Sequence, residues 1–151
     1  PLFQKYSVDL VLTGHDHAYG RGIAAESPLR KSQPLKGPVY VVSVSGPKLY
    51  MPAFTPWLQR VASNTQLYQR VRVEADKLRV EAYTVTGELY DAFDIKKNRR
   101  GQKTLIDWAP GLMKERTELP YSYQGRLTPE QQKEFDEKRE KYFKRKADQK
   151  N

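Results

Sequence analysis

The chain has 151 residues, no cysteine, and 27 Lys and Arg against 18 Asp and Glu, a formal net charge of +9. Without cysteine it can hold neither a disulfide nor a thiolate metal ligand, and no apolar run approaches the roughly 20 residues of a membrane-spanning helix. Hydrophobic residues make up 38% and charged residues 30% of the chain, which is enough for one apolar core with an unusually polar remainder.

The first predicted strand covers residues 7–13 and ends in a pair of histidines. Its apolar run stops at Gly14, and His15 and His17 follow as the only two histidines of the chain. Imidazole is the commonest transition-metal ligand in proteins, and open α/β sheets bind ligands beyond the carboxyl ends of their strands. We therefore predict that His15 and His17 bind metal, and that Gly14 lets the chain turn between the strand and the rings.

Two histidines do not complete a hydrolytic metal site, which usually needs three protein ligands per ion and an open position for water. Asp9 lies at the opposite end of the strand, and the side chain of Asp16 is expected to point away from the two rings. We therefore expect most of the remaining ligands to lie outside this chain. The alternative is a polar loop in which the histidines only form hydrogen bonds with their neighbours.

Four further strands are predicted from their enrichment in Val, Tyr and Leu and from the turn residues between them. The last three are joined by short turns, so they form an antiparallel meander. In the first strand of this meander, Val71 and Val73 alternate with Arg70 and Arg72, which predicts one buried and one solvated face. The four predicted strands cover residues 39–45, 67–75, 78–85 and 88–95.

Two long loops are predicted, over residues 24–36 and 51–64. Loops that follow strand ends often carry function, and both Arg and Lys bind phosphate. The candidates for contact with a phosphate ester are Tyr19, Arg21, Lys48 and Tyr50. The alternative is that Tyr19 packs its own loop while Arg21 and Lys48 lie in solvent.

The composition changes after residue 97. Residues 98–127 contain prolines and scattered aromatic residues, which predicts an extended strap anchored by rings such as Trp108. A helix is predicted over residues 128–147, with Thr128 as its N-cap and Gln131 as the partner in a capping box. Its narrow apolar stripe consists of Leu127, Phe135, Tyr142 and Phe143.

The positive charge raises a nucleic-acid-binding alternative. Binding of this kind needs basic residues gathered on one face, usually with aromatic rings for stacking. Here the excess is spread along the chain, and the predicted helix alternates both signs. The pattern therefore indicates a generally basic surface, and nucleic acid is not a favoured partner.

Residues 14–17, continued by Ala18, Tyr19 and Arg21, resemble the G-H-x-H motif of the calcineurin-like metallophosphoesterases, and specifically its purple acid phosphatase-like branch. The strand with its glycine turn at residues 37–46 and the strands within residues 68–95 resemble the closing strands of the same domain. The resemblance covers residues 1–97. It implies an α/β (α+β) fold, the C-terminal part of a two-sheet sandwich of mainly antiparallel strands, to which a charged C-terminal helix is added.

The resemblance also implies two metal ions (Fe, Zn or Mn), with His15 a ligand of one ion and His17 a ligand of the other, and a phosphate ester as substrate. No catalytic residue beyond these ligands is then expected here. The family's earlier motifs should lie in an upstream N-terminal part of the same protein, so we expect the 151-residue chain alone to be inactive. A periplasmic or secreted location is also implied. The alternatives are an inactive structural or binding module and a basic nucleic-acid-binding segment.

Overall fold

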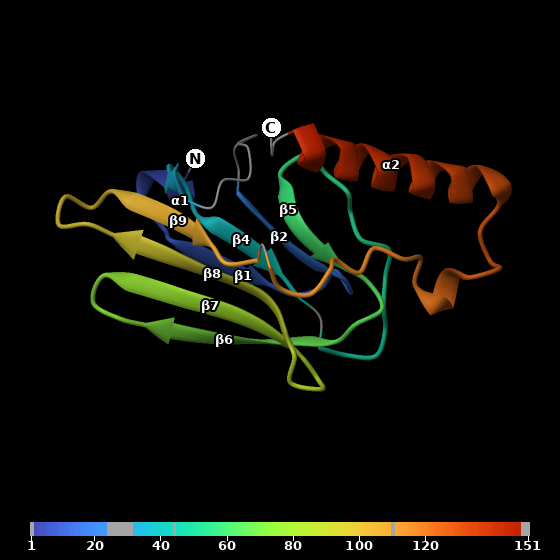
Figure 1. The fold of residues 1–151 in the computed structure, drawn as a ribbon, viewed down its shortest axis with the longest axis horizontal. Coiled ribbons are helices and arrows are strands. Elements are labelled where there is room, and N and C mark those ends of the chain that lie inside the picture. The colour runs from blue at the N-terminus through green and yellow to red at the C-terminus, as the bar shows by residue number, and fades with distance from the viewer. Residues whose placement is uncertain (1, 24–31, 44, 110, 149–151) are drawn as a thin grey trace.

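The computed structural model describes residues 2–23, 32–43, 45–109 and 111–148, and these residues form two β-sheets with a long helix along one side (Figure 1). This α+β architecture, with mainly antiparallel strands and a C-terminal helix, confirms the predicted fold class. The elements are α1 (Leu2–Lys5), β1 (Leu10–Thr13), β2 (Tyr19–Ile23), β3 (Ser32–Leu35), β4 (Val39–Val42), β5 (Leu58–Ala62), β6 (Leu67–Val73), β7 (Lys77–Thr84), β8 (Leu89–Lys97), β9 (Lys103–Asp107), η1 (Tyr121–Tyr123) and α2 (Pro129–Asp148).

The first sheet has the strand order β1-β4-β2-β5. Strands β1 and β4 run parallel, with Leu10 opposite Val39 and Thr13 opposite Val42. The other two pairings are antiparallel. Because parallel strands end at the same edge, the segments that follow β1 and β4 leave the sheet side by side.

The second sheet has the order β3-β9-β8-β7-β6 and is antiparallel throughout. Strands β6, β7 and β8 form the predicted meander. The predicted alternation in β6 is only partly correct: Val71 packs against the core, whereas Val73 is 77% exposed. Strand β6 lies at the edge of the sheet, and its last two residues are exposed.

Four strands lie where the sequence predicts other structure. Strand β5 falls inside the predicted loop 51–64 and β9 inside the predicted strap 98–127. Strand β3 falls at the end of the predicted loop 24–36, of which residues 24–31 lie outside the described residues. Strand β2 has the sequence Tyr-Gly-Arg-Gly-Ile, in which glycine lowers strand propensity. Gly22 is nevertheless required, because a Cβ there would clash with the backbone of Trp57.

The core lies between the two sheets. Buried residues alternate with half-buried ones in β4 and β9, and Val80 and Ala82 of β7 also belong to the core, so apolar side chains from both sheets meet between them. The largest contributions come from strands in the middle of each sheet. Fully buried members include Tyr19, Val39, Val41, Val80, Tyr90, Phe93 and Leu105.

A charged network joins the two sheets through this core. Arg21 of β2 is 0% exposed. Its Nε donates to Asp91 Oδ2 at 2.8 Å and its Nη2 to Asp107 Oδ1 at 3.0 Å, and the hydroxyl of Tyr19 donates to Asp91 Oδ2 at 2.7 Å. Burial alone would lower the pKa of Arg21, but the two carboxylates outweigh it and raise the pKa, so the guanidinium stays charged.

Helix α2 runs beside β5 (Figure 1), and the two elements pack through a short apolar seam. The predicted capping box is confirmed, since Gln131 N donates to Thr128 Oγ1 at 3.3 Å and Thr128 N donates to Gln131 Oε1 at 2.9 Å. Of the predicted stripe, Phe135 and Tyr142 are buried, and Phe143 remains 37% exposed.

No helix in the part of the chain that the structure describes is long and apolar enough to cross a membrane.

Substitution of Asp91 by Asn should destabilise the protein strongly, because it leaves the buried guanidinium of Arg21 with one carboxylate in place of two. We expect the free energy of unfolding to fall by about 3–5 kcal/mol, measured by urea denaturation followed by circular dichroism. Glu74→Gln breaks the half-exposed pair of Glu74 with Lys77 (3.2 Å) and is the matched control. Its expected loss is below about 1 kcal/mol, and equal losses for both variants would contradict a role for the network.

Candidate metal centre

The two histidines lie at the edge where the parallel strands end. Strand β1 ends at Thr13 and β4 at Val42, and the backbone N–H of Ser43 donates to the carbonyl of Thr13 at 3.1 Å. Residues 14–18 follow β1, and residues 45–50 belong to the connection that follows β4. The structure therefore brings the histidine turn together with the loop that carries Lys48 and Tyr50, two of the predicted site residues.

His17 is held in a defined orientation by this second loop. Its Nδ1 lies 2.9 Å from the carbonyl oxygen of Lys48. A carbonyl can only accept a hydrogen bond, so Nδ1 carries the proton and the lone pair of Nε2 is left available. The ring also packs against Tyr50, with 4.8 Å between ring centroids, and Tyr50 N donates to the carbonyl of His17 at 2.8 Å. Metal-binding histidines characteristically use their second nitrogen in this way.

His15 adopts a backbone conformation that is rare for a residue with a side chain. Its φ is +79°, in the left-handed region, and its side chain is 97% exposed. The prediction that Gly14 would provide the turn is therefore wrong, because the left-handed residue is His15 itself. Such a conformation costs on the order of 1 kcal/mol or more and is concentrated at functional sites. It turns the imidazole of His15 out from the sheet edge.

The side chain of Asp16 was expected to point away from both rings, and for His15 this is wrong. Its Oδ1 lies 3.7 Å from Nδ1 of His15, which is too far for a hydrogen bond but close enough for a carboxylate to lie beside the ring. Asp16 also lines a small cavity of about 210 Å³ together with Tyr50. The turn therefore presents two imidazoles and one carboxylate.

These donors suit a transition metal, since imidazole and carboxylate are ligands of Zn, Fe and Mn. The number of these donors, however, is too small for a complete metal site. Across residues 2–23, 32–43, 45–109 and 111–148, no three His, Cys, Asp or Glu side chains come close enough together to hold a metal ion. A centre built on His15 and His17 would therefore draw on donors beyond these residues.

Two predicted substrate-binding residues lie in the interior. Arg21 is fully enclosed and bound to Asp91 and Asp107, and Tyr19 is 2% exposed with its hydroxyl on Asp91. Neither presents its polar group at the histidine edge, and Arg21 does not lie in solvent either, as the alternative required. The sequence contained one signal of this outcome, since Tyr19 and Arg21 occupy alternate positions of a strand and so share a face.

The other two predicted residues lie beside His17. Lys48 is exposed, and its Nζ lies 5.0 Å from the centre of the Tyr50 ring. The neighbouring hydroxyl of Tyr50, and to a smaller extent that of Tyr123, raises the pKa of Lys48. The ammonium is therefore cationic throughout the neutral pH range, which makes it suitable for contact with an anion.

A cavity of about 600 Å³ adjoins Lys48 and Tyr50. Its opposite wall comes from the predicted strap and from the start of α2, which sequence reasoning did not connect with the histidines. The aromatic residues of the strap were recognised as anchors, but nothing in their spacing indicated which surface they would meet. The residues that give this cavity its chemical character are Lys48, Tyr50, Tyr121, Tyr123, Arg126 and Leu127.

Compared with protein-family models, with curated proteins and with solved structures, the chain matches none of them. The resemblance of residues 14–17 to a metallophosphoesterase motif therefore remains a prediction that rests on the residues themselves.

The tautomer of His17 is a direct test of this geometry. At a pH where both rings are neutral, we expect His17 to be protonated on Nδ1, because the carbonyl of Lys48 accepts that proton. His15 is the internal control, since its exposed ring should populate both tautomers. Long-range ¹H–¹⁵N correlation spectra distinguish the two forms, and a His17 protonated mainly on Nε2 would contradict the arrangement.

Proposed function

We propose that His15 and His17 are ligands in a two-metal phosphoesterase centre, one imidazole for each ion. The observation that carries this proposal is the hydrogen bond from Nδ1 of His17 to the carbonyl of Lys48, which leaves Nε2 as the donor for a metal. The left-handed backbone at His15 supports it as well, because it directs the second ring outward from the same turn.

The position of the turn agrees with this function. Both rings lie beyond the carboxyl ends of the parallel strands β1 and β4, where open α/β sheets bind ligands. In such a centre, paired metal ions polarise a phosphoryl oxygen and lower the pKa of a bound water. The residues of this chain would hold their rings in place, supply positive charge through Lys48 and exclude water with Tyr50.

Further donors are needed, and we assign them to a part of the protein outside these 151 residues. Because two imidazoles cannot fill two coordination shells, carboxylate, amide or imidazole groups must complete them. We therefore expect phosphoesterase activity only from a protein that supplies the two histidines together with these further metal ligands.

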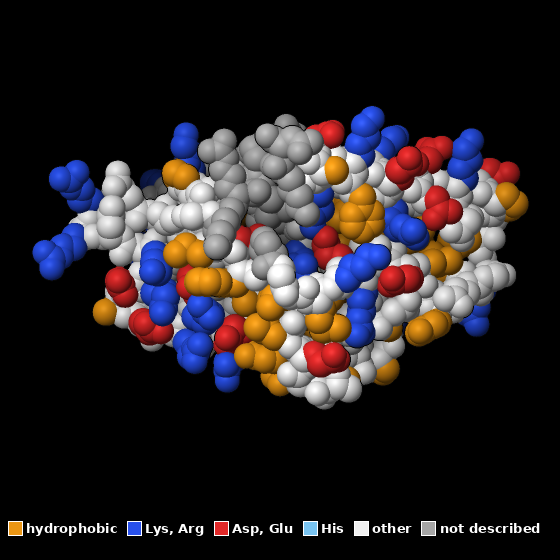
Figure 2. Space-filling view, viewed as in Figure 1, with side chains coloured by type: hydrophobic (Ala, Val, Ile, Leu, Met, Phe, Trp, Pro, Cys, Tyr) orange, Lys and Arg blue, Asp and Glu red, His pale blue; other side chains and the backbone are white. Residues whose placement is uncertain are grey.

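The described residues on the face that Figure 2 shows do not favour the nucleic-acid alternative. On the face shown in Figure 2, Lys and Arg side chains are scattered, with Asp and Glu between them. On the outer face of β6 and β7, Arg70, Arg72 and Arg79 are each within 4 Å of Glu81, and Arg79 also pairs with Asp94, so two carboxylates lie among these three cations. A continuous basic groove, which nucleic-acid binding would require, is not formed there.

Loss of either imidazole should remove one metal ion. In the complete protein, we expect His15→Ala and His17→Ala each to lower the metal content from two ions to one, measured by elemental analysis. Hydrolysis of 4-nitrophenyl phosphate should fall by about 100-fold or more, because loss of a direct ligand exceeds the 10- to 100-fold effect of losing its hydrogen-bond partner.

The control is Asp76→Asn, which removes an exposed carboxylate in the turn between β6 and β7 and should leave both quantities unchanged. Unchanged metal content and turnover in both histidine variants would refute the proposal. Loss of both ions in each single variant would refute the assignment of one imidazole to each ion.

A further inference from the structure

The cavity beside His17 has a chemical character that none of the preceding assignments explains. Its volume of about 600 Å³ falls within the range of small-molecule sites. Lys48 and Arg126 are the only charged side chains among the described residues that line it, so the lining carries two positive charges and no negative one. The site therefore suits an anion.

Three tyrosine rings also line this cavity. Tyr50 comes from the loop after β4, and Tyr121 and Tyr123 come from η1 on the opposite wall. Tyrosine rings provide broad contact surfaces for a flat ring at a low cost in side-chain entropy, since only two torsions are fixed. Leu49 and Leu127 add apolar area beside them. A ligand that fills the cavity would combine a negative charge with a ring.

The two walls are joined by hydrogen bonds. Ser122 Oγ donates to the carbonyl of Leu49 at 3.2 Å, directly between η1 and the loop. Asn64 also holds η1 in place, since its Oδ1 accepts from Tyr121 N at 3.0 Å and its Nδ2 donates to the carbonyl of Leu119 at 3.1 Å. Because the walls are already in place, a ligand would bind with little ordering of the chain.

The cavity and the histidine turn share one loop. The carbonyl of Lys48 holds His17, while the side chain of Lys48 lines the cavity, and Tyr50 contacts His17 with its ring and also lines the cavity. The cavity therefore adjoins the loop whose backbone and Tyr50 ring orient His17.

We propose that this cavity binds a phosphate monoester that carries an aromatic ring, with the ring among Tyr50, Tyr121 and Tyr123 and the phosphate between Lys48 and Arg126. Arginine provides paired N–H donors that match phosphate oxygens, and lysine adds a point charge. The inference that such an ester is the substrate rests on the proposed phosphoesterase function. The inference that the cavity binds it does not.

The test is to titrate the 151-residue chain with each phosphate compound in the presence of a chelator, so that no metal is bound. Binding is measured by isothermal titration calorimetry. Phenyl phosphate should bind, and inorganic phosphate and cyclohexyl phosphate should each bind about tenfold more weakly, because stacking of a flat ring contributes roughly that factor. Adenosine 5′-monophosphate carries the same two groups with a larger ring and distinguishes a nucleotide from a simple aryl ester. Binding of either ester supports the proposal, and binding of neither overturns it.

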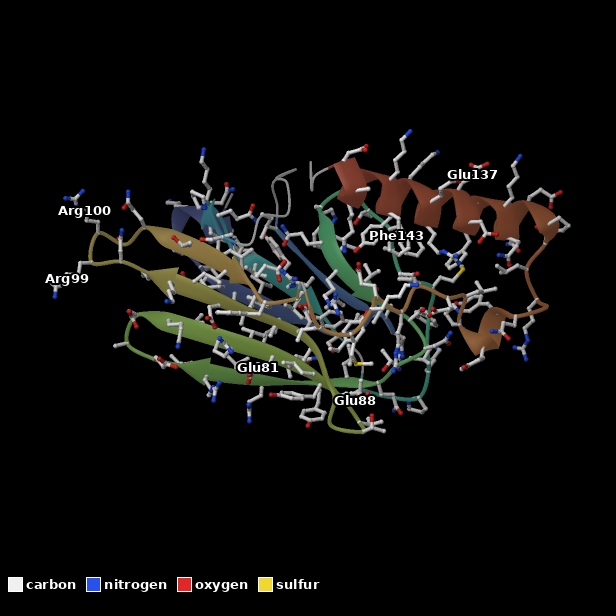
Figure 3. The ribbon with its side chains drawn as sticks, viewed as in Figure 1. Glu81, Glu88, Arg99, Arg100, Glu137 and Phe143 are labelled. Atoms are coloured by element: carbon white, nitrogen blue, oxygen red, sulfur yellow. The ribbon has the colours of Figure 1, made fainter. Side chains whose placement is uncertain are left out.

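Two variants locate the binding. Arg126→Ala should weaken phenyl phosphate by about tenfold, the usual factor for a charge-assisted hydrogen bond, and Arg126→Lys should restore part of the affinity. Arg100→Ala is the matched control, because Arg100 projects from the turn between β8 and β9 at the opposite end of the molecule from η1 (Figure 3). Equal weakening by Arg126→Ala and Arg100→Ala would show nonspecific attraction and overturn the proposal.

The same titration separates this inference from the phosphoesterase proposal. His15→Ala should leave metal-free binding of phenyl phosphate unchanged, since the exposed side chain of His15 does not line the cavity. Binding that persists in a protein without metal or hydrolysis would refute the proposed function alone, and metal uptake without binding of either ester would refute the cavity assignment alone.

Discussion

The buried ion network of Arg21, Asp91 and Asp107 is the constraint on which the rest of the structure depends. It ties the inner face of the β1-β4-β2-β5 sheet to the inner face of the other sheet. A guanidinium without contact to water must have its charge compensated, so β2 can sit only where both carboxylates reach it. The apolar core supplies most of the driving force for folding, while this network selects one alignment of the two sheets.

That alignment determines the geometry of the histidine edge. Strand β2 follows the histidine turn directly and pairs with β4, and β4 in turn pairs with β1. Fixing β2 therefore fixes both ends of residues 14–18, and the loop after β4 meets the turn through His17 and Lys48. The C-terminal segment is attached to the same body through Ser63, whose N–H donates to the carbonyl of Arg116 at 2.8 Å. The direct contacts that orient His17, with the Lys48 carbonyl and the Tyr50 ring, thus depend on how the strands on either side are aligned.

The sequence predicts well those parts of the fold in which buried positions are apolar. Strands β4, β7 and β8 were recognised because valines and aromatic residues fill their inner face, and the helix was recognised from its capping box and charged pattern. Strands β2 and β5 were missed because Arg21, Gln59 and Arg60 occupy buried positions, and their partners are distant in sequence. The position of the two histidines beyond the end of β1 could be predicted because they directly follow that strand in the sequence. The cavity could not, since its walls meet only after the strap has docked.

The cavity walls come from segments 73 residues apart in the chain, joined by the contact of Ser122 with Leu49. The histidine turn contributes to neither segment. Evolution can therefore alter what the cavity accepts by exchanging residues of the strap, while the turn and its strands stay under separate selection for stability. The choice of ligand in the cavity and the structure of the histidine turn can therefore change independently. Relatives of this chain that keep the turn need not keep the strap.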